Sequence, residues 1–344
     1  MARISTRGAA ALISLALCAS ASVARALESV TVGATSSITD LPFFIAEKRG
    51  YFTAEGLDVK FVNFDSAARM IAPLASGDLD VASGGPSAAL YNAIARGVGV
   101  RIVADRTTAA PGRYSQILLV RKALVDSGRV KAIADLKGLR LANAAPGSSA
   151  MGTLNRLYKM AGLKEGDIEK VYMSFPQQII ALENGATDLA MPTEPYASEA
   201  TRRGFAVPLI TDDKIYPGHQ IAVMIFSDAF RAKHGNVGVA FIRAYIRAVR
   251  DQNAALVNGR LAGPGAEEFI SLIAENTSVK DKAFLRTLTL SNADNDGKLN
   301  MDSLKEDFEV FRAAGLIEGK ISVDEAVDSS FTTRASAALA AGAK

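Results

Sequence analysis

The sequence contains one cysteine, Cys18, and two histidines, His219 and His234. Cys18 lies in an N-terminal segment that we expect to be removed, so the mature chain would have no disulfide, no thiol nucleophile and no thiolate metal ligand. The two histidines do not have the spacing of metal ligands. These absences exclude enzyme classes that depend on cysteine, and they predict a protein without a metal or a cofactor.

The sequence also lacks a large surplus of charge. Its 39 basic residues outnumber its 36 acidic residues by three, and the N-terminal segment carries three arginines and no acidic residue. No stripe of Lys and Arg with interleaved aromatics is present, so we do not expect nucleic acid as a partner. After the N-terminal segment, no apolar stretch approaches the roughly 20 residues that a membrane-spanning helix needs.

That N-terminal segment, residues 1–26, has the pattern of a secretory signal. Arg3 and Arg7 precede a run of small and apolar residues from Ala9 to Ala24, and Ala24-Arg25-Ala26 offers the small residues that a signal peptidase selects. A lipid anchor at Cys18 fits less well, because the preceding Leu17 stands where a lipoprotein signal has Gly, Ala or Ser. The pattern predicts cleavage after Ala26 and export to the periplasm.

The remaining residues are too many for one small core and suit two lobes of ordinary domain size. Short β-branched runs alternate with helical patterns, which indicates parallel βαβ units. The expected strands are 29–34, 57–64, 79–82 and 100–104 in a first series, and 139–142, 168–173, 188–191 and 205–210 in a second. We therefore assign 27–121 to lobe 1, 122–220 to lobe 2 and 221–344 to a mainly helical return to lobe 1.

One internal repeat supports two equivalent lobes. Leu74-x-x-Gly77-x-x-Asp80-Val81-Ala82 is matched by Leu182-x-x-Gly185-x-x-Asp188-Leu189-Ala190. Each copy predicts a helix that ends near a glycine with positive φ and is followed by an apolar strand. Any α/β protein can reuse such a junction, but the two copies are spaced as equivalent corners of two lobes would be.

The segment Ala46-x-x-x-Gly50-Tyr51-Phe52-x-x-Glu55-Gly56-Leu57-Asp58-Val59 resembles the periplasmic solute-binding proteins of sulfonate, nitrate and taurine importers, which are grouped with the NMT1/THI5-like proteins. Similar matches are residues 74–82, Asp135 to Leu141, Pro146-Gly147-Ser148 and Glu194-Pro195-Tyr196. The resemblance extends from about Val30 to Phe331. It implies an α/β type II periplasmic-binding fold, in which two lobes joined by a hinge hold a ligand in the cleft between them.

Ligands of open α/β sheets bind beyond the carboxyl ends of the strands, so the loops that follow the strands are the candidate site. Hydroxyls and glycine-flanked amides at helix starts suit a sulfonate or carboxylate, because the first N–H groups of a helix have no partner within it. The candidate ligand-binding residues are Ser36, Ser37, Thr39, Asp40, Phe43, Asp65, Ser83, Gly84, Ser87, Arg113, Gly147, Ser148, Ser149, Glu194 and Tyr196.

Within this set, the Gly147-Ser148-Ser149 turn is the strongest candidate for holding an anion. Arg113 and Tyr114 lie near the expected crossing between the lobes, where a cation and an aromatic ring could hold an anion or a ring. The carboxylates Asp40, Asp65 and Glu194 could cap helices, close the cleft or bind the amino or hydroxyl groups of a zwitterion. Asn292-x-Asp294-x-Asp296-Gly297 imitates a calcium loop, but Ser303 stands where a bidentate Glu belongs, so we interpret it as a polar turn.

The resemblance implies a monomeric solute-binding protein that delivers its ligand to the permease of an ABC importer, with no catalysis. Two alternatives remain open at this point. A thiamin-precursor synthase of the same fold would need a cysteine-rich motif, and a ligand-presenting subunit of a membrane sensor would have the same sequence pattern. The candidate solutes are sulfonates, taurine, nitrate, aromatic carboxylates and pyrimidine precursors.

Overall fold

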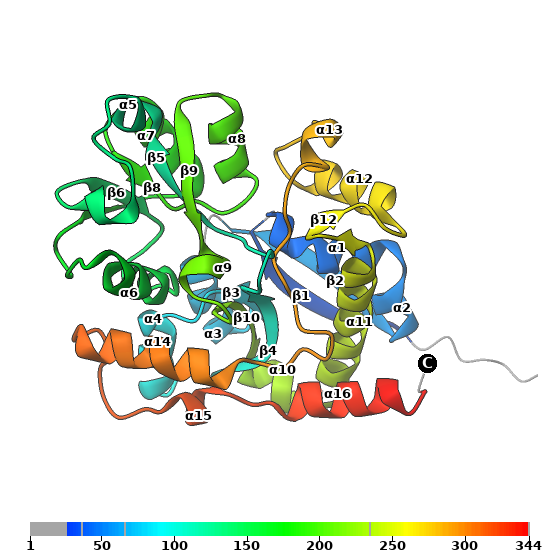
Figure 1. The fold of residues 1–344 in the computed structure, drawn as a ribbon. Coiled ribbons are helices and arrows are strands. Elements are labelled where there is room, and N and C mark those ends of the chain that lie inside the picture. The colour runs from blue at the N-terminus through cyan, green and yellow to red at the C-terminus, as the bar shows by residue number, and fades with distance from the viewer. Residues whose placement is uncertain (1–25, 36, 65–66, 234, 343–344) are drawn as a thin grey trace, which may run out of the picture.

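The computed structural model describes residues 26–35, 37–64, 67–233 and 235–342, so nearly all of the expected signal segment lies outside the described residues. Figure 1 shows two lobes, each built around its own sheet. Both sheets have five strands, in the orders β2-β1-β3-β10-β4 and β7-β6-β8-β5-β9. The mixed α/β, two-lobed architecture expected from the sequence is confirmed.

The sheet of lobe 1 combines strands from both ends of the chain. Parallel pairing joins β1 to β2 and β3, whereas β10 runs antiparallel between β3 and β4. The strands are β1 (Glu28–Ala34), β2 (Leu57–Asn63), β3 (Val81–Gly84), β4 (Val100–Thr108) and β10 (Gln220–Ser227). Because β10 comes after lobe 2 in the sequence, it ties the two parts of lobe 1 together.

The sheet of lobe 2 repeats this arrangement with a continuous stretch of chain. β6 pairs in parallel with β7 and β8, and β5 runs antiparallel between β8 and β9. The strands are β5 (Ile117–Arg121), β6 (Arg140–Asn143), β7 (Glu169–Tyr172), β8 (Leu189–Ala190) and β9 (Ala206–Thr211). The internal repeat of the sequence falls on β3 and β8, which occupy equivalent positions in the two sheets, and Gly77 and Gly185 both have positive φ.

Helices cover both faces of each sheet. Those of the first part of lobe 1 are η1 (Ile38–Asp40), α1 (Leu41–Lys48), α2 (Tyr51–Ala54), η2 (Ala67–Met70), α3 (Ile71–Ser76) and α4 (Ala88–Ala95). Lobe 2 carries α5 (Lys122–Asp126), η3 (Ile133–Leu136), α6 (Ala150–Ala161), α7 (Phe175–Glu183), α8 (Tyr196–Arg202) and α9 (Asp212–Ile215). Neighbouring residues of β5 serve opposite faces, because Leu118 and Val120 join one apolar cluster and Ile117 and Leu119 the other.

The return to lobe 1 is mainly helical. It contains α10 (Asp228–Lys233), α11 (Gly235–Ala254), the short hairpin β11 (Leu256–Val257) and β12 (Arg260–Leu261), α12 (Ala266–Asn276), α13 (Lys282–Leu285), α14 (Met301–Ala313), α15 (Val323–Ala326) and α16 (Ser330–Ala340). Among the described residues, no helix combines the length and the apolar character needed to cross a lipid bilayer.

The two lobes are joined by two crossing segments. The chain leaves lobe 1 between β4 and β5, through residues 109–116, and returns through residues 212–219, which include α9. The sequence pattern placed residues up to 121 in lobe 1, but β5 pairs with β8 and β9 and so belongs to the second sheet. A five-residue apolar strand at a lobe boundary has no sequence feature that assigns it to one sheet or the other.

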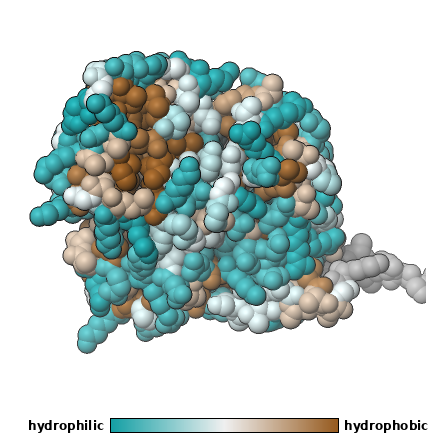
Figure 2. Space-filling view, viewed as in Figure 1, coloured by the Kyte–Doolittle hydropathy of each residue, from teal (hydrophilic) through white to brown (hydrophobic). Residues whose placement is uncertain are grey.

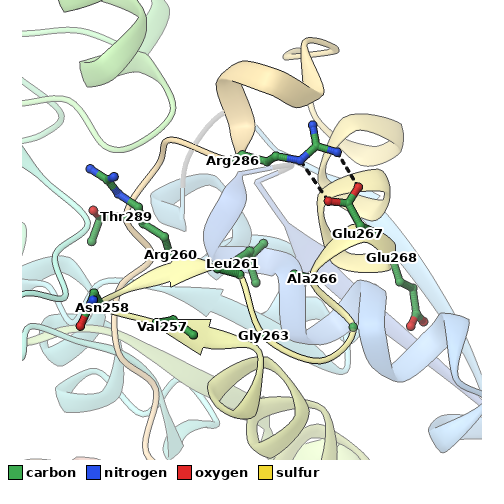
Figure 3. A pocket seen from close by; sticks show the side chains of 12 residues that line it. Val257, Asn258, Arg260, Leu261, Gly263, Ala266, Glu267, Glu268, Arg286 and Thr289 are labelled. Atoms are coloured by element: carbon green, nitrogen blue, oxygen red, sulfur yellow. Dashed lines mark hydrogen bonds and ion pairs between the residues drawn. The ribbon is translucent and has the colours of Figure 1, made fainter.

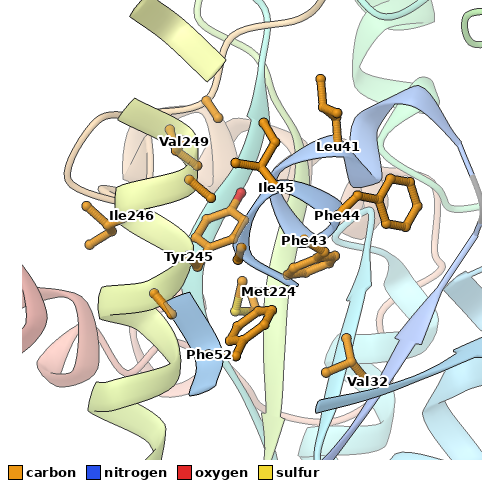
Figure 4. Close-up of a cluster of buried hydrophobic side chains, with 14 of the residues drawn as sticks. Val32, Leu41, Phe43, Phe44, Ile45, Phe52, Met224, Tyr245, Ile246 and Val249 are labelled. Carbon is orange, nitrogen blue, oxygen red and sulfur yellow. The ribbon is translucent and has the colours of Figure 1, made fainter. Parts of the chain in front are cut away.

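The core of lobe 1 lies between its sheet and the helices α1 and α11 (Figure 4). Phe43 of α1 packs against Tyr245 of α11, with the ring centroids 5.4 Å apart, and Phe52 stacks on Phe241 at 5.1 Å. α1 begins with Pro42 in its first turn, where the missing N–H of proline costs nothing. Burial of these aromatic rings fixes α1, and with it the loop between β1 and α1.

Candidate functional site

The loops that follow equivalent strands of the two lobes are in direct contact. Ser87, between β3 and α4, forms an antiparallel bridge with Ser148, between β6 and α6. The backbone N–H of Ala88 donates a hydrogen bond of 2.8 Å to the carbonyl of Gly147 in the other lobe. The structure therefore brings together three candidate residues from both lobes, at the carboxyl ends of β3 and β6.

This contact uses up polar groups that the sequence pattern assigned to a ligand. The Ser87 hydroxyl caps α4 by accepting from Leu90 N at 3.2 Å, and the Ser148 hydroxyl donates to the carbonyl of Ala145 at 2.9 Å. Ser149 is buried against Gly85, where an added Cβ would come within 2.8 Å of its Oγ. The first N–H of α4 thus binds the other lobe, and the Gly147–Ser149 turn serves in holding the lobes together.

The loop between β1 and α1 is organised around Asp40. Its carboxylate is fully buried, accepts from Ser37 N at 3.0 Å through Oδ2 and is paired with the Arg106 guanidinium of β4 through Oδ1. Arg106 also donates to the Thr39 hydroxyl at 3.0 Å, and the hydroxyls of Ser37 and Thr39 lie 2.7 Å apart. Asp40 is therefore a structural residue, whereas the half-buried hydroxyls of Ser37 and Thr39 lie on a loop that it holds in place.

Glu194 is likewise committed to its own lobe. Its carboxylate is 1% exposed and accepts from both the N–H and the hydroxyl of Ser198, at 3.0 and 2.7 Å. Burial raises the pKa of Glu194, and the hydrogen bonds from Ser198 partly oppose this rise. Tyr196, at the start of α8, is half-buried, with its ring 6.3 Å from that of Phe175. Of these two candidates, only Tyr196 has part of its side chain at the surface.

Arg113 lies in the first crossing segment, as expected, but its side chain is directed into lobe 1. Its Nη2 donates to the side-chain oxygen of Asn253 and to the carbonyl of Ser291, both at 2.8 Å. Burial lowers the pKa of Arg113 to about 10, and no carboxylate among the described residues forms an ion pair with it. Arg113 thus joins the crossing segment to the helical part of lobe 1.

The remaining candidates divide between the core, the strand ends and the undescribed positions. Phe43 is 1% exposed and packs in the core of lobe 1, so we leave it out of the proposed site. Ser83 and Gly84 are the last residues of β3, and the buried Ser83 hydroxyl has no hydrogen-bond partner among the described residues. Ser36 and Asp65 lie outside the described residues, as does His234.

Two residues that the sequence pattern did not single out also carry buried oxygens without a partner. Thr193, in the loop after β8, bridges Gln116 of the first crossing segment, and within the described chain neither Thr193 Oγ1 nor Gln116 Oε1 accepts or donates a hydrogen bond. Buried polar atoms in folded proteins are nearly always paired with protein, water or ligand. Ser83 and Thr193 follow the same logic in both lobes, since they lie at the ends of the equivalent strands β3 and β8.

These residues could not have been selected from the sequence with equal ease. Thr193 lies directly before Glu194, in a loop that the rule on strand ends already identifies. Gln116 belongs to no motif, and its pairing with Thr193 joins positions 77 residues apart, so no local signal identifies it.

A separate pocket of about 1020 Å³ lies beside the crossing segments, between the lobes. Lobe 2 contributes α8, β9 and α9 to its wall, and lobe 1 contributes β12 and α13. At its rim, Arg202 of lobe 2 lies 3.6 Å from the Asp281 carboxylate and 4.7 Å from the ring centroid of Phe284, both in lobe 1. None of the candidate residues expected from the sequence lines this interlobe pocket.

Apolar side chains gather on the face of lobe 2 next to this pocket. Figure 2 shows them as a brown patch over the part of the lobe that carries β5 and β9. Leu209 and Ile210 of β9 are only partly buried, and both also line the interlobe pocket. One wall of the pocket is therefore apolar.

A third hollow, of about 780 Å³, lies within lobe 1 around the β11–β12 hairpin (Figure 3). Its most prominent charged groups are Glu267 and Arg286, which form a bidentate ion pair with distances of 3.0 and 2.5 Å. Among the described residues, no group of three or more His, Cys, Asp or Glu side chains is arranged to hold a metal ion. The turn around Asp294, which imitates a calcium loop in sequence, is held by the N–H groups of Asp296 and Lys298 on the Asp294 carboxylate.

The strand order, the two crossing segments and the contacting loops define a two-lobed protein of the periplasmic-binding type. Residues 24–257 match the model of the NMT1-like family, and the chain belongs to this family. The resemblance found in the sequence is therefore confirmed.

The relatives of this chain are binding proteins of import systems. A Bacillus subtilis protein named as an aliphatic sulfonates-binding protein is 25% identical over 316 residues, which cover 90% of this chain and 88% of the relative. The nitrate-binding protein NrtA of Synechocystis has a TM-score of 0.73 at 14% identity, covering 91% of this chain and 89% of its own. The aliphatic sulphonate-binding protein SsuA of Escherichia coli has a TM-score of 0.65 at 20% identity, covering 88% and 92%.

These two structures are described as periplasmic, and at such identities they show a shared fold. The relatives named here are binding proteins and not enzymes, so we treat this chain as a binding protein without catalytic activity.

Proposed function

We propose that this protein is the solute-binding component of an ABC importer and captures a small anionic or zwitterionic organic solute, such as a sulfonate or a carboxylate, between its lobes. The observation that carries the proposal is the contact between the loops after β3 and β6, made by lobes that only two crossing segments connect. Membership of the NMT1-like family and the sulfonate- and nitrate-binding relatives support it.

The proposal includes a location and a partner. The signal-like pattern of residues 1–26 supports export to the periplasm, where a monomeric protein would deliver its solute to a membrane permease. The lobe boundaries that we propose follow the sheets: lobe 1 comprises residues 27–108 and 220–342, lobe 2 comprises 117–211, and the crossing segments form the hinge.

We define the strand-end site as Ser37, Thr39, Ser83, Gln116, Thr193 and Tyr196. These residues offer hydroxyls and one amide from both lobes and from the first crossing segment, and three of their oxygens are buried without a partner. A hydroxyl can donate to the oxygen of an anion and can equally accept from an amino group, so the set suits a sulfonate, a carboxylate or a zwitterion. Arg106 adds positive charge behind the Thr39 hydroxyl.

Binding in this site would select the closed arrangement of the lobes. A ligand shifts such an equilibrium only through its differential affinity for the two arrangements. A solute that contacts Thr39 of lobe 1 and Thr193 of lobe 2 has this property, since it loses half of its contacts when the lobes separate. Ser87 and Gly147 contribute by providing the direct contact between the lobes.

A thermal melting assay tests the proposal. Methanesulfonate, taurine, nitrate and benzoate form the panel, and dimethyl sulfone serves as the neutral control. A solute present at about 100 times its Kd adds about 2.7 kcal/mol to the free energy of unfolding, which raises Tm measurably. If no member of the panel raises Tm above the shift of the neutral control, the assignment of an anionic solute is wrong.

Variants locate the solute. Thr193→Val removes a hydroxyl with little change of shape, and Gln116→Leu removes the unpaired amide. Both should reduce the solute-induced shift in Tm. Thr201→Val is the matched control, because the Thr201 hydroxyl donates to the carbonyl of Ala197 within α8 and lies outside the strand-end site. Equal shifts in Thr193→Val and Thr201→Val would place the solute elsewhere.

A further inference from the structure

The interlobe pocket beside the crossing segments is distinct from the strand-end site. Its wall is drawn from the sides of β9 and α8 in lobe 2 and from β12 and α13 in lobe 1, whereas the strand-end residues follow β1, β3 and β8 or precede β5. With about 1020 Å³ it has room for a small organic molecule. A molecule in this pocket would touch both lobes.

Each lobe contributes one cation to the pocket that is not engaged elsewhere. Lys214, on α9 of lobe 2, and Arg260, on β12 of lobe 1, are both exposed and both line the pocket. Within the described chain, neither forms an ion pair with an Asp or Glu, although most arginines of this protein do. The third cation of the wall, Arg202, is bound by Glu199 at 2.7 Å.

The acidic residues of the wall are already satisfied. Asp213 accepts from Gly112 N at 2.8 Å and from the Thr211 hydroxyl at 2.5 Å. Asp281 caps α13 by accepting from Phe284 N at 3.1 Å, and its other oxygen faces Arg202. The positive charges of Lys214 and Arg260 are therefore not neutralised locally, and the pocket favours an anion.

The direction of the Arg260 side chain agrees with this placement. In Figure 3 it points away from β12 and from the Glu267–Arg286 pair, toward the side where lobe 2 lies. Arg260 therefore presents its guanidinium to the interlobe pocket and not to the acidic side chains of its own lobe. A guanidinium can bind two oxygens of one sulfonate or carboxylate group at once.

The rest of the wall is apolar or aromatic. Ile117, Pro208 and Leu209 line it from lobe 2, Phe284 from lobe 1 and Tyr114 from the crossing segment. An inorganic anion would leave these surfaces in contact with water, whereas an organic anion would cover them with its hydrocarbon part. The lining thus favours an anion with a ring or a short aliphatic body.

We propose that the interlobe pocket is a second binding site, which takes a small organic anion between Lys214 and Arg260 and thereby holds the two lobes together. The site differs from the one proposed for the transported solute, and it does not depend on that proposal. Its occupant links the lobes at the flank of the hinge, next to the contact of Arg202 with Asp281 and Phe284.

Residue-resolved acetylation of the purified chain tests this site. The chain is labelled with limiting acetic anhydride, with and without benzenesulfonate, and the rate at each lysine is measured by peptide mass spectrometry. We expect benzenesulfonate to lower the rate at Lys214 severalfold and to leave Lys320, an exposed lysine of lobe 1, unchanged. Benzyl alcohol, which carries the ring without the charge, should protect neither.

Three variants separate direct binding from indirect effects. Arg260→Gln should abolish the protection of Lys214, and Lys305→Gln, which removes an exposed cation of α14, should retain it. The double variant Thr193→Val, Gln116→Leu should also retain it, because those residues belong to the strand-end site. Unchanged Lys214 labelling in the unmodified chain, equal protection in Arg260→Gln, or loss of protection in the double variant would each overturn the proposal.

The two proposals can fail independently. A panel of solutes that leaves Tm unchanged, together with protection of Lys214 that depends on Arg260, contradicts only the transport assignment. A shift in Tm that survives in Arg260→Gln, without any protection of Lys214, contradicts only the second site.

Discussion

The imidazole of His219 and the carboxylate of Asp307 form a fully buried pair, in which Nε2 lies 2.8 Å from Oδ2. The other ring nitrogen of His219 lies 3.1 Å from the hydroxyl of Thr153 on α6, while Asp307 belongs to α14. Figure 1 shows these two helices side by side, α6 in lobe 2 and α14 in lobe 1, and they are in contact. The second crossing segment thus carries a side chain that joins one helix of each lobe.

Replacement of His219 by Ala should therefore destabilise the protein strongly. The change leaves the buried Asp307 carboxylate without its partner, and breaking a buried pair in this way costs about 3–5 kcal/mol. Urea denaturation measures the loss. Arg312→Ala is the control, because this exposed arginine pairs with Glu309 on the surface of the same helix, and we expect a change within about 0.5 kcal/mol. A similar small effect for His219→Ala would show that the pair adds nothing to stability.

The stability of the protein should fall as the pH rises from 4 to 6. Burial raises the pKa of Asp212 to about 6, above the 3.8 of a free aspartate. Between these values the native state binds more protons than the unfolded state, so the free energy of unfolding decreases with increasing pH. In Asp212→Asn, we expect the decrease between about pH 4.5 and pH 7 to be about 2 kcal/mol smaller. Urea denaturation at both pH values tests this, with the exposed Asp302→Asn as control.

An alanine at position 85 should push the lobes apart. Its Cβ would lie 2.8 Å from Ser149 Oγ in lobe 2 and 3.2 Å from the carbonyl of Ile221. We expect Gly85→Ala to weaken solute binding and to enlarge the radius of gyration measured by small-angle X-ray scattering. Adding Ser149→Ala removes the closer of the two atoms and should restore part of the binding. No difference between the single and the double variant would contradict the close approach to Ser149 as the cause.

Phe43→Ala should reduce stability and leave solute binding intact. The ring is buried among Phe61, Phe241 and Tyr245, and loss of a buried Phe side chain costs about 3–5 kcal/mol. The solute-induced shift in Tm should persist, since the ring does not reach the surface. If the shift disappears while the variant remains folded by circular dichroism, Phe43 belongs to the binding site after all.

Much of the fold is predictable because its signals are local. The helix–glycine–strand junctions at Gly77 and Gly185 are visible as a repeat, and they mark the equivalent strands β3 and β8. By contrast, β10 reads as an apolar run of eight buried residues with nothing to show that it inserts between β3 and β4. Its partners are more than 100 residues away, and only the assembled sheet places it there.

The site was less predictable, for a related reason. Asp40 and Glu194 looked like ligand residues, yet each is satisfied by a neighbour three or four residues away, Ser37 or Ser198, which is the usual role of such residues at helix starts. The pairing of Gln116 with Thr193, and the two unengaged cations Lys214 and Arg260, depend on how the lobes meet. Sequence spacing has no information on that meeting.

The position of β10 also bears on the order in which a growing chain can reach its final form. Residues 117–211 complete the sheet of lobe 2 from one continuous stretch, whereas β4 acquires its neighbour in the sheet only after residue 227 has been made. Domains generally form as units while the chain is extended from its N-terminus. Lobe 2 is thus the first half of the molecule that can be finished, although it begins later in the sequence. The earlier strands must wait, with an open edge, for a segment that is synthesised after it.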